Sequence, residues 1–183
     1  MKKIAKVIVA VIAVIAALFV GFFFITISYN NEYKGDFKEV LKSTAAAPAK
    51  KAIVIYQPSK HGTSAKIAKR LAEGLNSSGY EVTLSYPGAH LPASLGEYDI
   101  VAFGTPVYFG QISLALTDYM ERSTDLAGKK VLIYSVGNDK ELPEFAAFER
   151  SLKGVRPGAK KKFIAADTDS VDLAYKFGVD FGK

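Results

Sequence analysis

The chain has 183 residues, a formal net charge of +6 and no cysteine. This length allows one ordinary domain with a short extension. The absence of cysteine excludes thiol catalysis, disulfides and cysteine-ligated zinc or iron–sulfur centres, so any redox chemistry must come from a bound cofactor. Residues 51–183 hold 17 basic and 15 acidic residues, and a charge of only +2 argues against nucleic-acid binding.

The first segment of the chain is strongly apolar. Residues 7–27 contain no charged residue, and a helix of this length, at 1.5 Å per residue, covers a hydrocarbon core of about 30 Å. This pattern predicts a transmembrane anchor within residues 1–28. A cleaved signal peptide is the alternative, but its apolar region is usually only about 7 to 15 residues and is closely followed by small residues at the cleavage site.

Basic residues flank the predicted span on both sides. They are Lys2, Lys3 and Lys6 before it, and Lys34, Lys38 and Lys42 after it. Positive charge marks the cytoplasmic side of a span, so the lysines before the span favour an outward domain and those after it oppose one. The two sets nearly balance. The expectation is a single-pass protein of the cell membrane with its domain outside the cytoplasm, by a small margin.

Residues 29–50 are expected to form a linker between the span and the folded domain. Apolar residues at helix-like spacing, among them Tyr33 and Phe37, suggest a short interfacial helix in its first half, although Gly35 opposes one. The second half is rich in alanine. The linker would hold the domain near a membrane surface.

The remaining residues, 51–183, alternate strand and helix patterns. Strands are predicted near residues 51–56, 80–86, 98–104, 129–135 and 161–166, and helices near 63–77, 112–123, 142–153 and 170–178. This alternation favours a parallel sheet covered on both faces, with right-handed crossovers. The predicted fold class is α/β, with a doubly wound sheet of five parallel strands.

A loop rich in hydroxyl groups joins the first predicted strand of this domain to its first helix. It runs from Gln57 to Ser64 with the sequence QPSKHGTS. A phosphate at a helix start meets unpaired backbone N–H groups and the positive end of the helix dipole. Gly62 lets the backbone approach closely, and the hydroxyls of Ser59, Thr63 and Ser64 can add donors.

A second loop, residues 104–111 (GTPVYFGQ), follows the apolar strand pattern that begins at residue 98. In a doubly wound sheet of order 2-1-3-4-5, strands one and three are neighbours at the switch point, so the loops at their carboxyl ends flank one crevice. We therefore expect the two loops to meet, although more than forty residues separate them in sequence.

The first loop resembles the phosphate loop of the flavodoxin family, and the resemblance extends over about residues 51–180. Flavodoxins hold the phosphate of FMN on a loop written Ser/Thr-x-Thr-Gly-x-Thr, which corresponds here to residues 59–64. The resemblance implies that Ser59, Gly62, Thr63 and Ser64 contact the phosphate. His61 replaces a hydroxyl, so its main-chain N–H would bond the phosphate while Lys60 or a protonated His61 supplies charge.

Residues 104–110 are similar to the second flavin loop of the same family. By this resemblance the backbone of Thr105, Pro106, Val107 and Gly110 approaches the edge of the flavin ring, and Tyr108 or Phe109 covers one of its faces. Residues 135–138 take the place of the third loop, through Ser135, Gly137 and Asn138. The stacking tyrosine of small flavodoxins is missing there, which leaves one face of the flavin open.

The chain also looks similar to flavodoxin-type, menaquinone-dependent protoporphyrinogen oxidases in the first loop and in the aromatic-Gly turn after residue 107. It lacks their long insertion before the final strand, so that activity is not implied. Purely structural roles are the alternative for single residues: Gly62 and Gly110 could be turn glycines, and Thr63 could be a helix cap.

The expected function is that of a membrane-tethered FMN protein that moves electrons to or from a redox partner protein or a quinone-like acceptor. The flavin would supply the chemistry, and no side chain is predicted to be catalytic. Two alternatives stay open: a binding or sensory module of the same fold without flavin, and an NAD(P)H:quinone reductase. No metal site is expected, because His61 and His90 are the only histidines.

Overall fold

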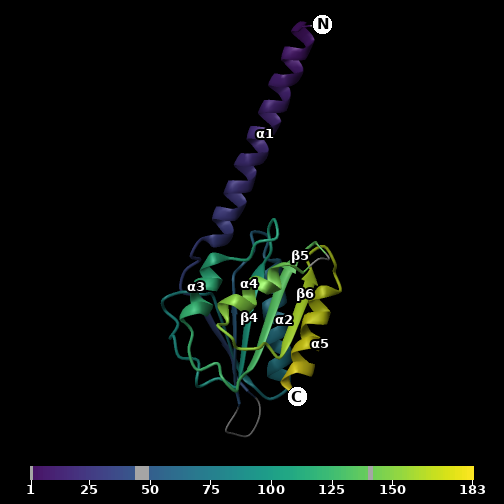
Figure 1. Cartoon of the computed structure of the whole chain (residues 1–183). Coiled ribbons are helices and arrows are strands. Elements are labelled where there is room, and N and C mark those ends of the chain that lie inside the picture. The colour runs from purple at the N-terminus through teal and green to yellow at the C-terminus, as the bar shows by residue number, and fades with distance from the viewer. Residues whose placement is uncertain (1, 44–49, 140–141) are drawn as a thin grey trace.

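The computed structural model describes residues 2–43, 50–139 and 142–183. A long helix, α1, leaves one end of an α/β domain, and the carboxyl terminus lies at the opposite end of that domain (Figure 1). Residues 44–49 of the predicted linker lie outside the described residues.

The described residues form one sheet of six strands with four helices around it. In chain order the elements are α1 (Lys2–Asn31), β1 (Lys38–Leu41), β2 (Lys51–Tyr56), α2 (Thr63–Ser77), β3 (Glu81–Ser85), β4 (Ile100–Pro106), α3 (Leu114–Arg122), β5 (Lys130–Gly137), α4 (Glu144–Ser151), β6 (Ala159–Ile164) and α5 (Ser170–Gly182). The sheet order is β1-β3-β2-β4-β5-β6. The strands from β3 to β6 are parallel, in the predicted 2-1-3-4-5 order, which confirms the fold class.

The predicted strand count is wrong by one, because β1 adds an antiparallel edge strand beside β3. It lies within the predicted linker, where the sequence suggested an interfacial helix. Glu39 pairs with Leu84 across the ladder, and Phe37, just before the strand, packs its ring against Tyr86 with 4.6 Å between ring centroids. Gly35 has a φ of 92°, a conformation that ends a helix rather than continues one.

The sheet is buried on both faces because its strands alternate their apolar side chains between two cores. Val54 faces one core, which contains Leu71 of α2 and Ala174 of α5. Ile53 faces the other, which contains Leu116 of α3 and Phe148 of α4. Helices therefore cover both faces, as expected for a doubly wound sheet (Figure 1).

α5 continues to Gly182, beyond the predicted limit at residue 178, and packs closely on α2. A Cβ at Gly178 would lie 2.3 Å from the carbonyl oxygen of Leu71, and one at Gly74 would lie 2.2 Å from that of Tyr175. Only glycine permits such an approach of two helix backbones. The glycines that lower helix propensity in isolation thus allow this helix to dock.

α1 is exposed along its apolar stretch and becomes buried only at its end, where Asn30 is 1% exposed. Its length and composition are sufficient to cross a membrane, although a signal sequence would pass the same test. Its last turns contact the edge of the sheet where the parallel strands end, which we call the carboxyl edge.

Candidate cofactor site

A cavity of about 360 Å³ lies at the carboxyl edge, between the end of α1 and three loops. The first loop contributes Lys60 and His61, the second Val107, Tyr108 and Phe109, and the third Asn138 and Asp139; α1 contributes Phe22, Ile25, Thr26 and Tyr29. The first two loops meet because β2 and β4 are neighbours, and the Gln57 N–H donates to the carbonyl of Gly104 at 2.9 Å. Four segments distant in sequence thus enclose one space.

The first loop is held by reciprocal hydrogen bonds between Ser59 and Ser64. The N–H of Ser64 donates to Ser59 Oγ at 3.1 Å, and the N–H of Ser59 donates to Ser64 Oγ at 2.6 Å. Ser64 Oγ in turn donates to the carbonyl of Gln57 at 2.9 Å, and its side chain is fully buried. The hydroxyl of Ser64 therefore shapes the loop, whereas Ser59 keeps its own proton available for a ligand.

Gly62 precedes α2 in a left-handed conformation, with a φ of 74°. Among the described residues nothing lies within 4 Å of where its Cβ would be, so the backbone here faces open space. Because Gly62 has no side chain, it cannot cap the helix. Within the described residues, the N–H groups of Thr63 and Ala65 in the first turn of α2 have no hydrogen-bond acceptor. Such groups attract an anion.

The second loop is a tight turn between Tyr108 and Gln111, whose backbone groups exchange hydrogen bonds of 3.2 and 3.0 Å. Phe109 and Gly110 both have positive φ, 53° and 74°. Tyr108 lies partly buried in the cavity wall, and burial, with a smaller effect of Tyr29, raises its pKa. The phenol therefore stays neutral and serves as a flat, polar-edged wall.

Thr105 and Pro106, which were predicted to approach a flavin, are buried at the end of β4. Thr105 Oγ1 donates to the carbonyl of Pro106 at 3.0 Å and accepts from the N–H of Ser113 at 3.2 Å. At Gly104 a Cβ would lie 1.9 Å from the ring of Tyr134. This part of the loop is fixed by packing inside the sheet, away from the cavity.

The third loop is supported from below by a buried ion pair. Glu144 Oε1 accepts from Ser135 Oγ at 2.7 Å and from Lys162 Nζ at 2.8 Å, and the side chains of Glu144 and Lys162 are 1% and 7% exposed. Burial alone would raise the pKa of Glu144, but these hydrogen bonds outweigh it and hold the pKa below its usual range. The hydroxyl of Ser135 thus donates to Glu144. From the third loop, Asn138 lines the cavity instead.

The contribution of α1 was not predicted from the sequence. The carbonyl of Asn30 accepts from Gln57 Nε2 at 2.9 Å and from Ser113 Oγ at 2.6 Å, and Asn31 Oδ1 accepts from the N–H of Leu114 at 2.9 Å. The last turn of α1 therefore binds the first loop and the start of α3. The only sequence signal was the appearance of Thr26, Tyr29 and Asn30 at the end of an apolar helix.

The predicted site residues therefore divide into two groups. Those that line the cavity are Lys60, His61, Val107, Tyr108, Phe109 and Asn138. The others lie outside that lining, in the first two loops, at the start of α2 and at the ends of β4 and β5: Ser59, Gly62, Thr63, Ser64, Thr105, Pro106, Gly110, Ser135 and Gly137.

The two ends of the cavity differ in chemistry. The exposed Lys60 and His61 lie beside the open helix start of α2, whereas Phe22, Tyr108 and Phe109 supply aromatic walls. A ligand with an anionic group at one end and a flat ring at the other matches this arrangement. Within the described residues no cluster of three or more His, Asp or Glu side chains could hold a metal ion.

Comparison with known proteins identifies the family. The family model described as a flavodoxin domain matches residues 53–169. An uncharacterized protein of Methanocaldococcus jannaschii is 28% identical over 85 residues, which cover 46% of this chain and 53% of that protein. The chain thus spans about half the length of this curated relative.

Solved structures share the fold at low sequence identity. The flavodoxin of Streptococcus pneumoniae TIGR4 is 21% identical, with a TM-score of 0.58 over 72% of this chain and 97% of that one. The two-electron reduced flavodoxin of Megasphaera elsdenii is 12% identical, with a TM-score of 0.60 over 72% and 98%. Flavodoxin 2 of Bacillus cereus is 23% identical, with a TM-score of 0.55 over 73% and 97%.

Proposed function

Because this chain belongs to the flavodoxin family, we propose that the cavity between α1 and the three loops binds FMN, and that the protein transfers electrons at a membrane. The observation that carries this proposal is the cavity itself, whose lining joins Lys60 and His61, just before the start of α2, to aromatic walls. Its volume of about 360 Å³ lies within the range of about 300–1,000 Å³ typical of ligand pockets.

The phosphate of FMN would be held at the start of α2. The free N–H groups of Thr63 and Ala65 and the helix dipole favour a dianion there, and Gly62 leaves room for it. Ser59 Oγ can donate a hydrogen bond, and Lys60 offers positive charge. The hydroxyl of Ser64 positions this loop without contacting the phosphate.

The ring system would lie between the second loop and α1. Tyr108, Phe109 and Tyr29 supply flat surfaces that bind and orient a ring and exclude water. When bound, FMN supplies the electron-transfer chemistry, since no side chain of the site is an evident acid or base. In our proposal α1 anchors the protein in a membrane as a single span, with the domain outside the cytoplasm, and the reaction partner is a redox protein or a quinone-like acceptor.

Titration of the purified full-length protein with FMN tests the proposal. We expect saturable quenching of flavin fluorescence at one FMN per chain. Lys60→Ala should weaken FMN binding about fivefold, because one exposed charge contact with a phosphate contributes about 1 kcal/mol. Riboflavin, which lacks the phosphate, should bind equally to both proteins.

Lys66→Ala is the matched control, because Lys66 is also an exposed lysine but does not line the cavity. It should bind FMN like the wild type. Failure of the wild-type protein to quench flavin fluorescence would exclude an FMN function and favour a binding module that has kept the fold without the cofactor.

A further inference from the structure

Exposed apolar side chains outside α1 gather at the carboxyl edge. In the described part of the domain, the large apolar residues that are more than a third exposed are Tyr33, Val40, Phe109, Leu114, Leu142 and Leu173. Leu114 and Leu173 lie in the first turns of α3 and α5, Leu142 lies between β5 and α4, and Tyr33 follows α1 by two residues. All except Val40 thus lie where the parallel strands end and α1 departs.

Phe109 extends furthest toward the apolar part of α1. Its ring contacts Phe19, Phe22 and Phe23, at centroid distances of 6.4, 6.3 and 4.8 Å, yet it remains 45% exposed. Its backbone holds a positive φ of 53°, which is unfavourable for a residue with a side chain. Packing against α1 keeps the ring in place despite this strain.

The depth of Phe109 follows from the length of α1. Its three phenylalanine partners precede Ile27, the last residue of the apolar run, by four to eight residues. At 1.5 Å per residue this is roughly 6–12 Å inside the run, similar to the depth of about 5–10 Å at which interfacial apolar groups insert into a bilayer.

We propose that the carboxyl edge of the domain docks on the lipid bilayer, with Phe109 inserted to the level of the acyl chains. This inference rests on the membrane anchoring of α1 that is part of the proposed function. It goes beyond anchoring, because an anchor followed by a flexible linker would leave the domain free in water.

Docking places the mouth of the cavity in the lipid. Phe22 and Ile25, which line the cavity on the α1 side, are 60% and 68% exposed in the absence of lipid. A reactant reaching the ring position from this side would therefore be dissolved in the bilayer. A lipid-soluble acceptor has direct access there, whereas a water-soluble protein does not.

A single tryptophan tests the insertion, since the chain contains none. Phe109→Trp in the full-length protein is reconstituted into phosphatidylcholine vesicles with brominated acyl chains, which quench fluorescence only near the hydrocarbon. We expect about a twofold loss of its fluorescence relative to unbrominated vesicles. Phe181→Trp, the same substitution near the carboxyl end of α5, should lose none.

Leu142→Trp gives a second probe of the same edge if Phe109→Trp fails to fold, and it too should be quenched. An alkaline carbonate wash and an FMN titration are run on the same samples. Unquenched probes in protein that resists the wash would overturn docking while leaving the anchor intact. Release by the wash would overturn both. Quenching of Leu142→Trp, which lies outside the cavity lining, together with its failure to bind FMN would support docking and reject the FMN function.

Discussion

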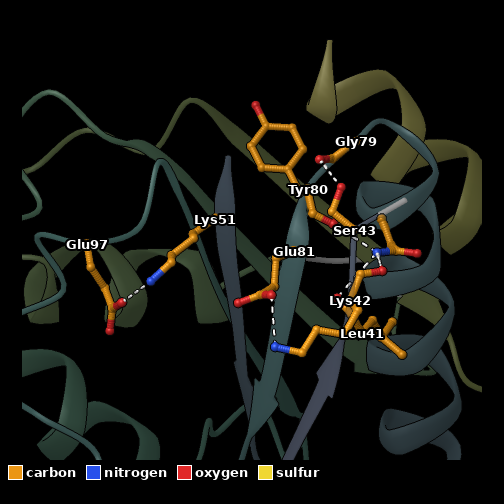
Figure 2. A network of polar contacts seen from close by, with 9 residues as sticks. Leu41, Lys42, Ser43, Lys51, Gly79, Tyr80, Glu81 and Glu97 are labelled. Carbon is orange, nitrogen blue, oxygen red and sulfur yellow. Dashed lines mark hydrogen bonds and ion pairs between the residues drawn. The ribbon is translucent and has the colours of Figure 1, made fainter. Parts of the chain in front are cut away.

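The two ends of the sheet place their charged groups differently. At the amino end of the parallel strands, Lys51 pairs with Glu97 at 2.7 Å and Lys42 with Glu81 at 3.1 Å, and these side chains remain 29–79% exposed (Figure 2). At the carboxyl edge, the pair Lys162–Glu144 is buried beneath the third loop. The ion pairs at the amino end are in contact with water, whereas the buried pair at the carboxyl edge supports the third loop.

The hollows at the two ends differ in the same way. The one at the amino end, of about 240 Å³, is lined mainly by charged residues, including Lys38, Lys51 and Glu97. There the polar contacts also hold β1 in place. Asn76 Nδ2 donates to the carbonyl of Lys42 at 2.9 Å. Ser43 Oγ donates to the carbonyl of Gly79 at 2.8 Å (Figure 2). A polar end suits contact with water, and an aromatic end suits a cofactor and lipid.

The largest effect is expected at the buried pair. Lys162→Met leaves the carboxylate of Glu144 buried without its cation, which should lower the free energy of unfolding by about 3–5 kcal/mol. Urea unfolding of the full-length protein in detergent measures it. Lys160→Met is the control. Lys160 lies on the same strand as Lys162 and forms an exposed ion pair with Glu149, so its replacement should change the stability little. Equal losses in the two variants would contradict the buried role.

The pH dependence of the same pair has a definite sign. In the wild type the pKa of Glu144 is lowered by folding, so its stabilisation is complete above the unfolded pKa of about 4.3 and is lost as the pH falls through the folded value. In Lys162→Met, burial without the cation should raise this pKa. As the pH falls through this raised pKa, the variant should therefore regain stability. Over the same pH range the wild type should keep the stability that ionised Glu144 contributes.

A smaller effect is expected at Gly62. Gly62→Ala forces a Cβ into a left-handed conformation, which costs about 1 kcal/mol, and places it where the phosphate would approach. FMN affinity should fall about tenfold, since contacts at a helix start contribute about 1–2 kcal/mol. Gly79→Ala, with a φ of 94° and similarly open surroundings, matches the strain away from the cavity. If both variants lost FMN affinity equally, strain rather than the site would be responsible.

The smallest effect is expected at the amino end. Glu97→Gln removes an exposed ion pair with Lys51, and the midpoint of thermal unfolding should fall by less than about 3 °C. Added salt should abolish even this difference, because it screens exposed charges. Differential scanning calorimetry at low and high salt measures it, and a larger, salt-independent fall would show that the charges at the amino end are not solvated.

Much of the domain was predictable because its signals are local. Ile67, Leu71 and Leu75 recur at helical spacing, and all three are fully buried in α2. The loops that follow β2 and β4 were expected to meet from the strand order alone. The edge strand β1 was missed, because four residues beside a glycine carry too short a pattern to distinguish a strand from a helix.

The rest of the site depended on contacts that no local pattern encodes. Ser64 and Ser135 carry the hydroxyls that a phosphate or flavin loop would use, but their partners, the carbonyl of Gln57 and the carboxylate of Glu144, appear only in the folded chain. The position of α1 over the loops depends on Asn30, whose backbone carbonyl makes the contacts. Every residue has a backbone carbonyl, so an acceptor of this kind cannot be recognised in the amino-acid sequence.

We infer that the apolar helix α1 forms one wall of the cofactor cavity, and Tyr29 offers the sharpest test of this claim. Tyr29 lies outside residues 53–169, which the family model matches, yet it lines the cavity. FMN titration of the full-length Tyr29→Ala variant should show about tenfold weaker binding, since an aromatic contact contributes about 0.5–1.5 kcal/mol beyond its buried area. The neighbouring Ser28→Ala variant should match the wild type. Wild-type FMN affinity in Tyr29→Ala would contradict the claim.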